Sequence, residues 1–206
     1  MKTKVLLIGA ALGLAVATAS ADAVYSSNVV GYVNVDLVAG WNMIANPLDS
    51  GDNVLSSVIA EAPDETSVYN FVNGNYVIAS YIEDDGGWDN DFSMKPGEGV
   101  FLYAPEAFAV TFVGEVKAGT HSVELPAGWA IVASPTPVAG DLDDIGLTAA
   151  VEDGDTVYKF ENGNYTIAEY VEEDGGWDND ITVGVAEGFF LNKATASTWT
   201  RTFEIK

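Results

Sequence analysis

Two acidic loops contain the side chains of this chain that are best suited to chemistry. The first is Glu83-Asp84-Asp85-Gly86-Gly87-Trp88-Asp89-Asn90-Asp91, and the second is Glu172-Glu173-Asp174-Gly175-Gly176-Trp177-Asp178-Asn179-Asp180. Calcium is bound by about six to eight oxygen atoms from carboxylates, amides and carbonyls on flexible loops. The sequence therefore predicts a candidate calcium site in each loop. The candidate metal ligands are Asp85, Asp89, Asp91, Asp174, Asp178 and Asp180.

Other interpretations of these loops stay open. The order of their residues is not that of an EF-hand, so the alternative is a solvated turn in which the aspartates bond to their own backbone. Trp88 and Trp177 could stack on a sugar, which would make the protein carbohydrate-binding. They could instead fill the cores of two small β modules, with their indole N–H groups bonded.

Enzymatic activity is not expected. A glycosidase needs an acid and a second carboxylate across a cleft, and two small modules offer no obvious cleft. The chain has no cysteine, which excludes thiol catalysis and cysteine-ligated zinc. A serine triad would have to use His121, the single histidine, and no serine stands in a nucleophile elbow. We therefore predict a protein that is not an enzyme, with His121 at the surface or at a junction between modules.

The charge of the chain limits its partners. Its 206 residues include 8 basic and 31 acidic side chains, which give a formal net charge of −23. Nucleic-acid binding depends on basic side chains that neutralise phosphates, so this class of protein is excluded. Docking on an anionic membrane is disfavoured for the same reason. Hydrophobic residues form 48% of the chain and aromatic residues 11%, so packed cores are expected in place of disorder.

The N-terminus is typical of an export signal. Lys2 and Lys4 precede an apolar segment over residues 5–16, and Ala19-Ser20-Ala21 offers a cleavage site. The apolar segment is short for a membrane span, although a retained anchor helix is the alternative. We expect residues 1–21 to be a signal peptide, which predicts a secreted protein without a membrane span and a mature charge of 6 − 31 = −25.

The acidic loops belong to a longer internal duplication. Residues 68–91 and 157–180 are nearly identical, and Trp177 follows Trp88 by 177 − 88 = 89 positions. A period of this length indicates tandem domains. Many short strand patterns and one brief helical pattern predict a mostly β fold with two tandem small modules of β-sandwich or β-barrel type. The predicted organisation is a signal peptide over 1–21, an N-terminal strand segment over 22–36, and β modules over 37–117 and 118–206.

Each copy contains a predicted β-hairpin. The pairs Asn73-Gly74 and Asn162-Gly163 suit two-residue type I′ turns, which need positive φ at both positions. The four residues of one hairpin face are identical in the two copies, whereas the other face differs, so we expect the first face to be buried. The residues expected to be buried are Tyr69, Phe71, Tyr76, Ile78, Tyr158, Phe160, Tyr165 and Ile167, and those expected to be exposed are Lys159 and Glu161. The pattern changes after Ile78, which predicts a bulge or bend there.

Two local differences between the copies lead to further predictions. An apolar stripe that includes Leu55 and Val58 predicts a short helix, capped by Asp52 or Asn53, whereas the second copy should form one turn or less. The pair Val185-Ala186 replaces Pro96-Gly97, so we do not expect both modules to share a positive φ at the Gly97 position.

Two motifs carry a family resemblance, Gly40-Trp41-Asn42-Met43-Ile44 and Pro96-Gly97-Glu98-Gly99. With them, the chain resembles surface modules of S-layer-type and other secreted prokaryotic proteins, and the second copy departs from the pattern at Ala130 and Val185-Ala186. The resemblance covers nearly all the mature chain and implies an extracellular structural or adhesive role without catalytic residues. The leading hypothesis is a secreted, self-assembling structural subunit of a filament, sheet or matrix. The alternative is a calcium-dependent adhesive or carbohydrate-binding pair of modules.

The N-terminal strand pattern is a candidate for self-association. Residues 24–37 are rich in β-branched and aromatic side chains, and residues 112–116 are a shorter counterpart before the second module. A surplus strand can pair with the sheet edge of another chain and give a head-to-tail polymer. The alternative, which we favour, is that the strand folds back against its own C-terminal strand, residues 199–205, and closes the molecule.

Overall fold

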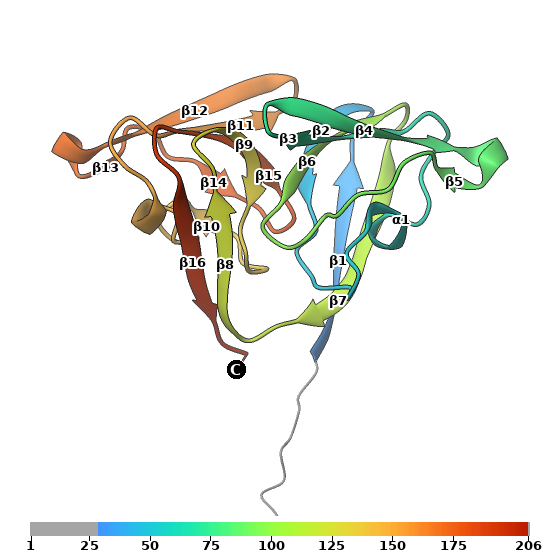
Figure 1. The fold of residues 1–206 in the computed structure, drawn as a ribbon, viewed down its shortest axis with the longest axis horizontal. Helices are drawn as coiled ribbons and strands as arrows, with labels where there is room; N and C mark the ends of the chain where they lie inside the picture. Colours follow the sequence, from blue (N-terminus) through green and yellow to red (C-terminus); the bar gives the residue numbers. More distant parts are fainter. Residues whose placement is uncertain (1–28, 206) are drawn as a thin grey trace, which may run out of the picture.

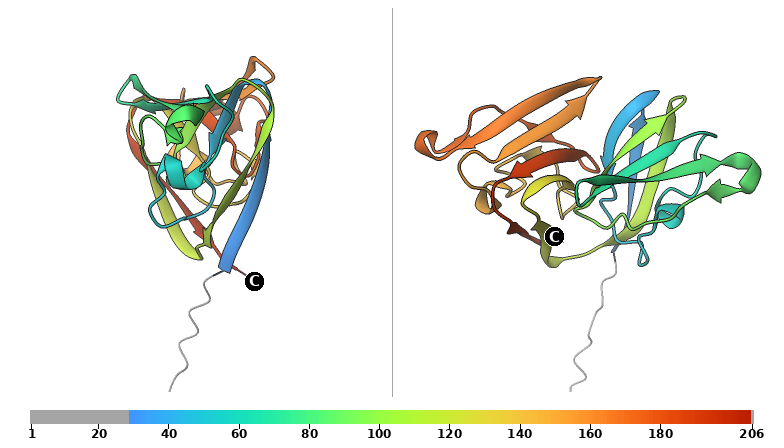
Figure 2. Two further views of the ribbon diagram at one scale, coloured as in Figure 1. Left: turned by 90° about the vertical axis from the view of Figure 1, so that its right-hand side faces the viewer. Right: turned by 45° about the horizontal axis from the view of Figure 1, so that its top comes forward.

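The computed structural model describes residues 29–205, and the predicted signal peptide lies outside this part of the chain. The described chain is mostly β, as predicted, and it forms two modules with the same topology (Figure 1). Each module combines a five-stranded antiparallel sheet with a two-stranded antiparallel ribbon. Figure 2 shows the modules as two lobes that lie side by side.

The first module has its core between the ribbon and the sheet. The ribbon consists of β1 (Val29–Leu37) and β7 (Phe108–Val116). The sheet has the order β2-β6-β3-β4-β5, with β2 (Gly40–Ala45), β6 (Gly99–Ala104), β3 (Ser67–Val72), β4 (Asn75–Ile82) and β5 (Gly87–Trp88). A short helix α1 (Leu55–Val58) adds to the core, and a 3-10 turn η1 (Glu83–Asp85) forms the acidic loop. The central buried side chains include Leu37, Ile44, Leu55, Val68, Leu102 and Phe112.

The second module repeats this plan. Its ribbon consists of β8 (Gly119–Leu125) and β16 (Ser197–Phe203). Its sheet has the order β13-β12-β11-β15-β9, with β9 (Gly128–Ala133), β11 (Thr156–Glu161), β12 (Asn164–Val171), β13 (Gly176–Trp177) and β15 (Gly188–Lys193). A small antiparallel pair consists of β10 (Gly140–Asp141) and β14 (Thr182–Val183). Two 3-10 turns, η2 (Thr148–Ala150) and η3 (Glu172–Asp174), lie between these strands in the sequence. The core centres on Trp199 and Phe189, which are fully buried.

The N-terminal strand is an integral part of the first module. β1 pairs with β7 over nine residues, from Val29 opposite Val116 to Leu37 opposite Phe108. The C-terminal strand β16 pairs instead with β8, so the predicted pairing of the two terminal strands is wrong. The counterpart of β1 in the second module is β8. The predicted counterpart, residues 112–116, belongs to β7. Residues 29–36 are therefore not the separate segment that the sequence predicted.

The two modules meet through equivalent edges, related by a local two-fold arrangement. The Ala45 N–H donates to Ala186 O at 2.9 Å, and the equivalent Ala133 N–H donates to Gly97 O at 3.0 Å. The backbones approach closely here, since a Cβ on Gly188 would lie 3.0 Å from Ile44 O, a tight contact that glycine avoids. The matched contacts join the two sheets along the broad upper side of the molecule (Figure 1).

The hairpins form with the predicted turns and register, but the predicted burial of their aromatic face is wrong. Asn73 and Gly74 have φ of 50° and 80°, and Phe71 lies opposite Tyr76. The residues that the hairpin buries are Val68 and Ala79, on the opposite face of the sheet. The residues predicted to be buried that are about half exposed are Tyr76, Ile78, Tyr165 and Ile167, whereas Tyr69, Phe71, Tyr158 and Phe160 are partly buried.

The reason for this error is that the core lies behind the other face of each sheet. The ribbon packs there, and the face with the identical residues points away from it. The pairing also continues without a break from Ile78 opposite Tyr69 to Ala79 opposite Val68, so the predicted bulge is absent from β4. The pattern changes because the residues that are identical in the two copies lie on the outer face at Tyr76 and Ile78 and on the core face at Ala79. Glu161 is exposed, as predicted, but Lys159 is partly buried through an ion pair with Glu187 at 3.2 Å.

Local features of the first module refine two other predictions. The helix α1 forms where the apolar stripe predicted it, and the second module has only the 3-10 turn η2. The predicted caps Asp52 and Asn53 do not cap it, since the Ser56 N–H donates to Asp91 Oδ1 at 3.1 Å. The positive φ is shared after all: 95° at Gly97 and 64° at Ala186.

Candidate functional site

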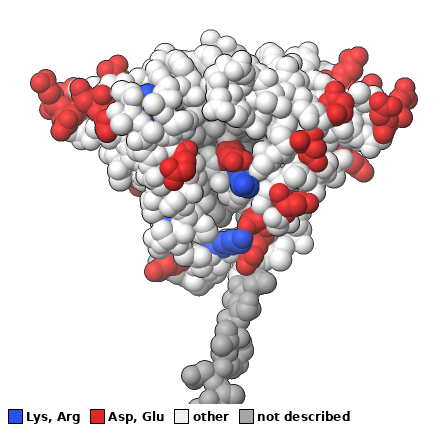
Figure 3. Space-filling model, in the orientation of Figure 1, with Lys and Arg blue, Asp and Glu red and all other residues white. Residues whose placement is uncertain are grey.

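An uncharged aromatic surface extends along the hairpins of both modules. We call it the aromatic face and define it by ten side chains, five from each module. They are Trp41, Tyr69, Phe71, Tyr76 and Phe101, with the equivalent Trp129, Tyr158, Phe160, Tyr165 and Phe190. In Figure 3 acidic side chains cover the two outer tips and others lie across the front of the molecule, whereas the top edge between the tips is largely free of charged residues.

Alternation along the strands places these side chains on one face. In β3, Val68 points into the core, so its neighbour Tyr69 points to the outer face. Tyr69 lies opposite Phe101 in β6, and Phe71 lies opposite Tyr76 in β4. Aromatic pairs of this kind on neighbouring strands stabilise a sheet through direct side-chain contact.

The aromatic face is continuous across the junction between the modules. The rings of Phe101 and Phe190, which are equivalent residues, have centroids 5.6 Å apart. Phe71 meets Phe190 at 6.0 Å, and the equivalent Phe160 meets Phe101 at 5.4 Å. Phe101 is buried together with Met43 and Ile131, and these three side chains form a small core cluster at the junction. The face therefore belongs to the pair of modules and not to either module alone.

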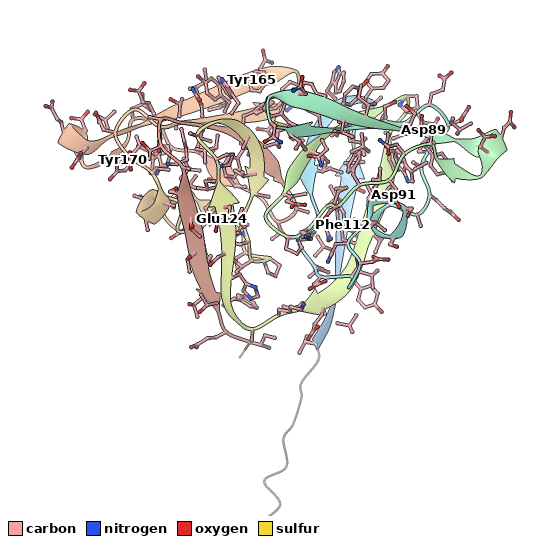
Figure 4. The ribbon with its side chains drawn as sticks, in the orientation of Figure 1. Asp89, Asp91, Phe112, Glu124, Tyr165 and Tyr170 are labelled. Atoms are coloured by element: carbon pink, nitrogen blue, oxygen red, sulfur yellow. The ribbon has the colours of Figure 1, made fainter. Side chains whose placement is uncertain are left out.

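Two equivalent pockets open on the aromatic face. The first has a volume of about 390 Å³ and is lined by Trp41, Tyr69, Tyr76, Phe101, Phe160 and Tyr165. The second has a volume of about 420 Å³ and is lined by Phe71, Trp129, Tyr158, Tyr165 and Phe190. Both volumes fall within the range of ligand pockets. Tyr165, which lies at the top of the molecule in Figure 4, belongs to both.

The rings of each pocket form walls and not a flat platform. Trp41 meets Tyr69 at a centroid distance of 5.0 Å with 57° between the ring planes, and it meets Phe101 at 5.7 Å with 79°. The second pocket repeats this arrangement, with Trp129 and Tyr158 at 4.9 Å and 47°. Neighbouring rings are thus tilted toward one another, so each pocket is concave.

Neither pocket carries a charged side chain. Burial raises the pKa of Tyr76, and burial together with the nearby Tyr76 raises the pKa of Tyr165. Both phenols are therefore neutral at physiological pH, because even the usual tyrosine value lies near 10. The polar side-chain groups of the two pockets are phenol hydroxyls and indole N–H groups.

The acidic loops at the tips are tied to neighbouring elements through their aspartates, and Asp91 accepts hydrogen bonds from Ser56 of α1. The Ser80 N–H donates to Asp89 Oδ1 at 2.7 Å, and the Glu169 N–H donates to Asp178 Oδ1 at the same distance. Within residues 29–205, no three His, Asp or Glu side chains come together as a metal site would require. The structure thus does not bring together Asp85, Asp89 and Asp91, or Asp174, Asp178 and Asp180. Calcium binding at these loops stays a prediction.

The two loop tryptophans occupy the edges of the cores. Trp88 donates from Nε1 to Ile59 O at 2.7 Å, and Trp177 donates from Nε1 to Thr148 Oγ1 at 2.9 Å. Both rings pack against the core of their own module. The sequence offered these tryptophans two roles, as sugar platforms or as core residues with bonded N–H groups, and the structure has the second arrangement. Trp41 and Trp129 were missed as surface residues. Their signal was present, because Ala-Gly-Trp opens the sheet in both copies.

A polar cleft separates the modules on the side away from the aromatic face. It has a volume of about 370 Å³, and His121 lines it at the junction, where its Nε2 lies 2.9 Å from Lys117 O. Asp49 forms an ion pair with Lys117 in this cleft. Burial alone would raise the pKa of Asp49, but hydrogen bonds from Lys117, Asn53 and Gly51 outweigh it and lower the pKa below its usual value.

Comparisons with known proteins do not assign this chain to a family. No family model, curated protein or solved structure matches it. Among residues 29–205, none of the helices is long and apolar enough to cross a membrane.

Proposed function

We propose that the chain is a non-enzymatic extracellular binding protein that holds its partner on the aromatic face. The observation that carries this proposal is the set of ten aromatic side chains that two modules place on one uncharged surface with two equivalent pockets. Export of the protein is supported by the signal-like N-terminal sequence.

Four residues of the aromatic face, Trp41, Tyr76, Trp129 and Tyr165, are about half exposed, and this exposure needs a reason. A contiguous apolar patch on a soluble protein commonly marks an interaction site. The chain has 31 acidic residues, which could cover such a surface, yet none of those within residues 29–205 lines either pocket of the aromatic face. All ten residues keep an aromatic partner in the other copy, although Tyr76 and Tyr165 are half exposed and contribute little to either core. Their retention therefore favours a role in binding.

The charge of the molecule selects the kind of partner. At a net charge of −23, the protein repels polyanions and other copies of itself, so a neutral or cationic partner suits the aromatic face. This favours the adhesive alternative over a self-assembling subunit. The strand-exchange route to a polymer has a further difficulty, because β1 is already paired with β7 and would first have to leave it.

Retention on insoluble surfaces tests the proposal. The mature protein is incubated with cellulose, chitin, bacterial cell-wall sacculi and phosphatidylcholine vesicles, and the bound fraction is measured after sedimentation. We expect retention on at least one surface, and its loss in the variant Trp41→Ala with Trp129→Ala. The matched control is Tyr32→Ala, since Tyr32 is an exposed aromatic residue of β1 outside the aromatic face.

Two results would overturn the proposal. The first is retention by the double variant equal to that of the wild-type protein on every surface. The second is that the aromatic face binds a second copy of the chain. Sedimentation equilibrium would then show a dimer for the wild-type protein and a monomer for the double variant. Circular dichroism confirms in each case that the variants remain folded.

A further inference from the structure

We propose that each pocket of the aromatic face binds a quaternary ammonium group, an inference that rests on the proposed function. A quaternary ammonium is a cation without hydrogen-bond donors, and an enclosure of aromatic rings is the established physical means of recognising it. The chemistry, shape and electrostatic surroundings of the pockets each support this ligand.

The lining of the pockets matches a ligand that makes no hydrogen bonds. All six residues of the first pocket and all five of the second are aromatic. A sugar would need several polar partners for its hydroxyl groups, and buried hydroxyls without partners are costly. Methyl groups on nitrogen make no such demand. The negative faces of aromatic rings attract the positive charge that those methyl groups share.

The shape of the pockets matches a compact, rounded group. Around the first pocket, Trp41 and Tyr69 are tilted by 57°, and Tyr69 and Tyr76 by 86°. Around the second, Tyr158 and Tyr165 are tilted by 84°. Rings at such angles offer no common plane on which a sugar chain could stack flat, and they offer a rounded group contacts with rings of several orientations.

The electrostatic surroundings also favour a cation. The acidic loops lie at both ends of the aromatic face, and the molecule as a whole is strongly negative (Figure 3). Such a field raises the local concentration of cations. The pockets themselves contain no carboxylate, so a small hydrated cation such as a primary ammonium finds no hydrogen-bond acceptor strong enough to replace its water. A quaternary ammonium is weakly hydrated, so it loses less hydration free energy when it enters the pocket.

The paired arrangement favours groups displayed on a surface over a free ligand. The two pockets share Tyr165 and open on the same face, so two neighbouring groups can bind at once. Simultaneous binding at two linked sites strengthens attachment without any new contact. A layer of choline head groups is a surface of this kind, and it carries no net charge that would repel the acidic protein.

The first experiment measures small-molecule binding by quenching of tryptophan fluorescence. The mature protein is titrated with tetramethylammonium chloride and with choline, at constant ionic strength set by sodium chloride. The decisive control is 3,3-dimethylbutanol, which has the shape of choline but no charge. We expect saturable binding of both cations and binding of the neutral alcohol that is at least about tenfold weaker, which is the effect of a modest cation–π contribution.

Variants locate the binding. Trp41→Ala should remove one of two equivalent sites, and Trp41→Ala with Trp129→Ala should remove both. Tyr32→Ala should bind like the wild-type protein. Because a tryptophan variant could lose structure, Tyr165→Ala provides a second test: it should weaken both sites while its half-exposed position leaves the fold intact. Equal binding of choline and the neutral alcohol would overturn the proposal, as would cation binding that survives in the double variant.

The second experiment tests the source of the group. Phosphatidylcholine vesicles should retain the protein, tetramethylammonium should release it, and phosphatidylethanolamine-rich vesicles should retain it far less. If the protein bound free cations but was not retained by vesicles, the proposal of a choline-bearing surface would be overturned, and the ligand would be a soluble quaternary ammonium. Retention on cellulose or chitin that depends on the aromatic face, but that tetramethylammonium does not reduce, would overturn the ligand and leave the proposed function standing.

Discussion

The two modules treat one buried position in opposite ways. Thr66 and Asp155 are equivalent residues: the Tyr81 N–H donates to Thr66 O at 2.8 Å, and the Tyr170 N–H donates to Asp155 O at 2.9 Å. In the second module, the Asp155 carboxylate forms a fully buried ion pair with Lys193. In the first, the equivalent of Lys193 is Ala104, and the buried Thr66 hydroxyl has no hydrogen-bond partner among the described residues.

The second module can hold two buried charges because they are paired and each makes further hydrogen bonds. Asp155 accepts hydrogen bonds from the Glu152 N–H at 2.8 Å and the Ala194 N–H at 3.0 Å. Lys193 also donates to Ala150 O at 2.9 Å. A buried charge is tolerated when it is paired and hydrogen-bonded, whereas a single unpaired hydroxyl costs less and can be left in place. The comparison therefore predicts different responses to substitution in two modules of one fold.

The largest effect is expected when the buried ion pair is broken. Lys193→Met leaves the Asp155 carboxylate buried without its partner, and we expect a loss of about 3–5 kcal/mol in the free energy of unfolding. Asp155→Asn together with Lys193→Met removes both charges and keeps an acceptor for one backbone N–H, so most of the loss should be recovered. Urea denaturation of Asp155→Asn, Lys193→Met and the double variant gives the coupling between the two sites. If Lys193→Met were as stable as the wild-type protein, Asp155 and Lys193 would not form a buried ion pair.

The next effect concerns the turn at Gly97, through which the first module contacts the second. A methyl group added at Gly97 would overlap Val123, and the residue would also keep its positive φ of 95°. Strain of this φ and overpacking together should make Gly97→Ala cost about 2–4 kcal/mol. The equivalent Ala186 already carries a methyl group, packed in the core cluster of the first module. Ala186→Gly should change stability by less than about 0.5 kcal/mol, because relief of strain offsets the lost methyl contact.

Comparable losses in Gly97→Ala and Ala186→Gly would show that the modules do not meet through the contacts seen here. Thermal unfolding followed by calorimetry measures both variants. It also reports whether the modules unfold together, as their shared aromatic face and paired edges lead us to expect.

Local signals explain what the sequence predicted correctly. The Asn-Gly pairs determine a type I′ turn, and the turn determines which residues of the hairpin lie opposite each other. The apolar stripe around Leu55 likewise predicted α1 from local periodicity alone. The mostly β fold and the two modules follow from the duplication and from many short strand patterns.

The errors arose where a pattern had two physical explanations. Identity between the copies at Tyr76 and Tyr165 is compatible with a core or with a binding surface, and only the position of the ribbon decides between them. The role of β8 as the counterpart of β1 was missed because its apolar residues are few, and its pairing with β16 spans most of the second module. The contacts that form the two pockets likewise join residues of different modules, such as Phe101 and Phe160.

A smaller effect is expected at the unpartnered hydroxyl of the first module. Thr66 is fully buried, and Thr66→Val replaces its hydroxyl with a methyl group of similar volume. Removal of an unsatisfied polar group should raise the free energy of unfolding by about 1 kcal/mol. Thr66→Ser keeps the hydroxyl, removes the methyl group and should lower stability instead. A destabilised Thr66→Val would show that the hydroxyl has a partner, such as a bound water molecule.

The smallest effect is expected at the acidic tips, where the two modules are most alike. Asn90 donates from Nδ2 to Ile78 O at 3.0 Å, and Asn179 donates to Ile167 O at 2.9 Å, so this bond from loop to strand is shared by both modules. Asp89 and Asp178 each accept a backbone N–H, which leaves fewer free oxygens for an ion. We therefore expect the melting temperature to be the same in millimolar calcium and in chelator. The calcium hypothesis makes the opposite prediction, because an ion that binds only the folded state raises the melting temperature. A rise that Asp89→Asn with Asp91→Asn halves, and that the equivalent change at Asp178 and Asp180 then abolishes, would establish one calcium site in each tip.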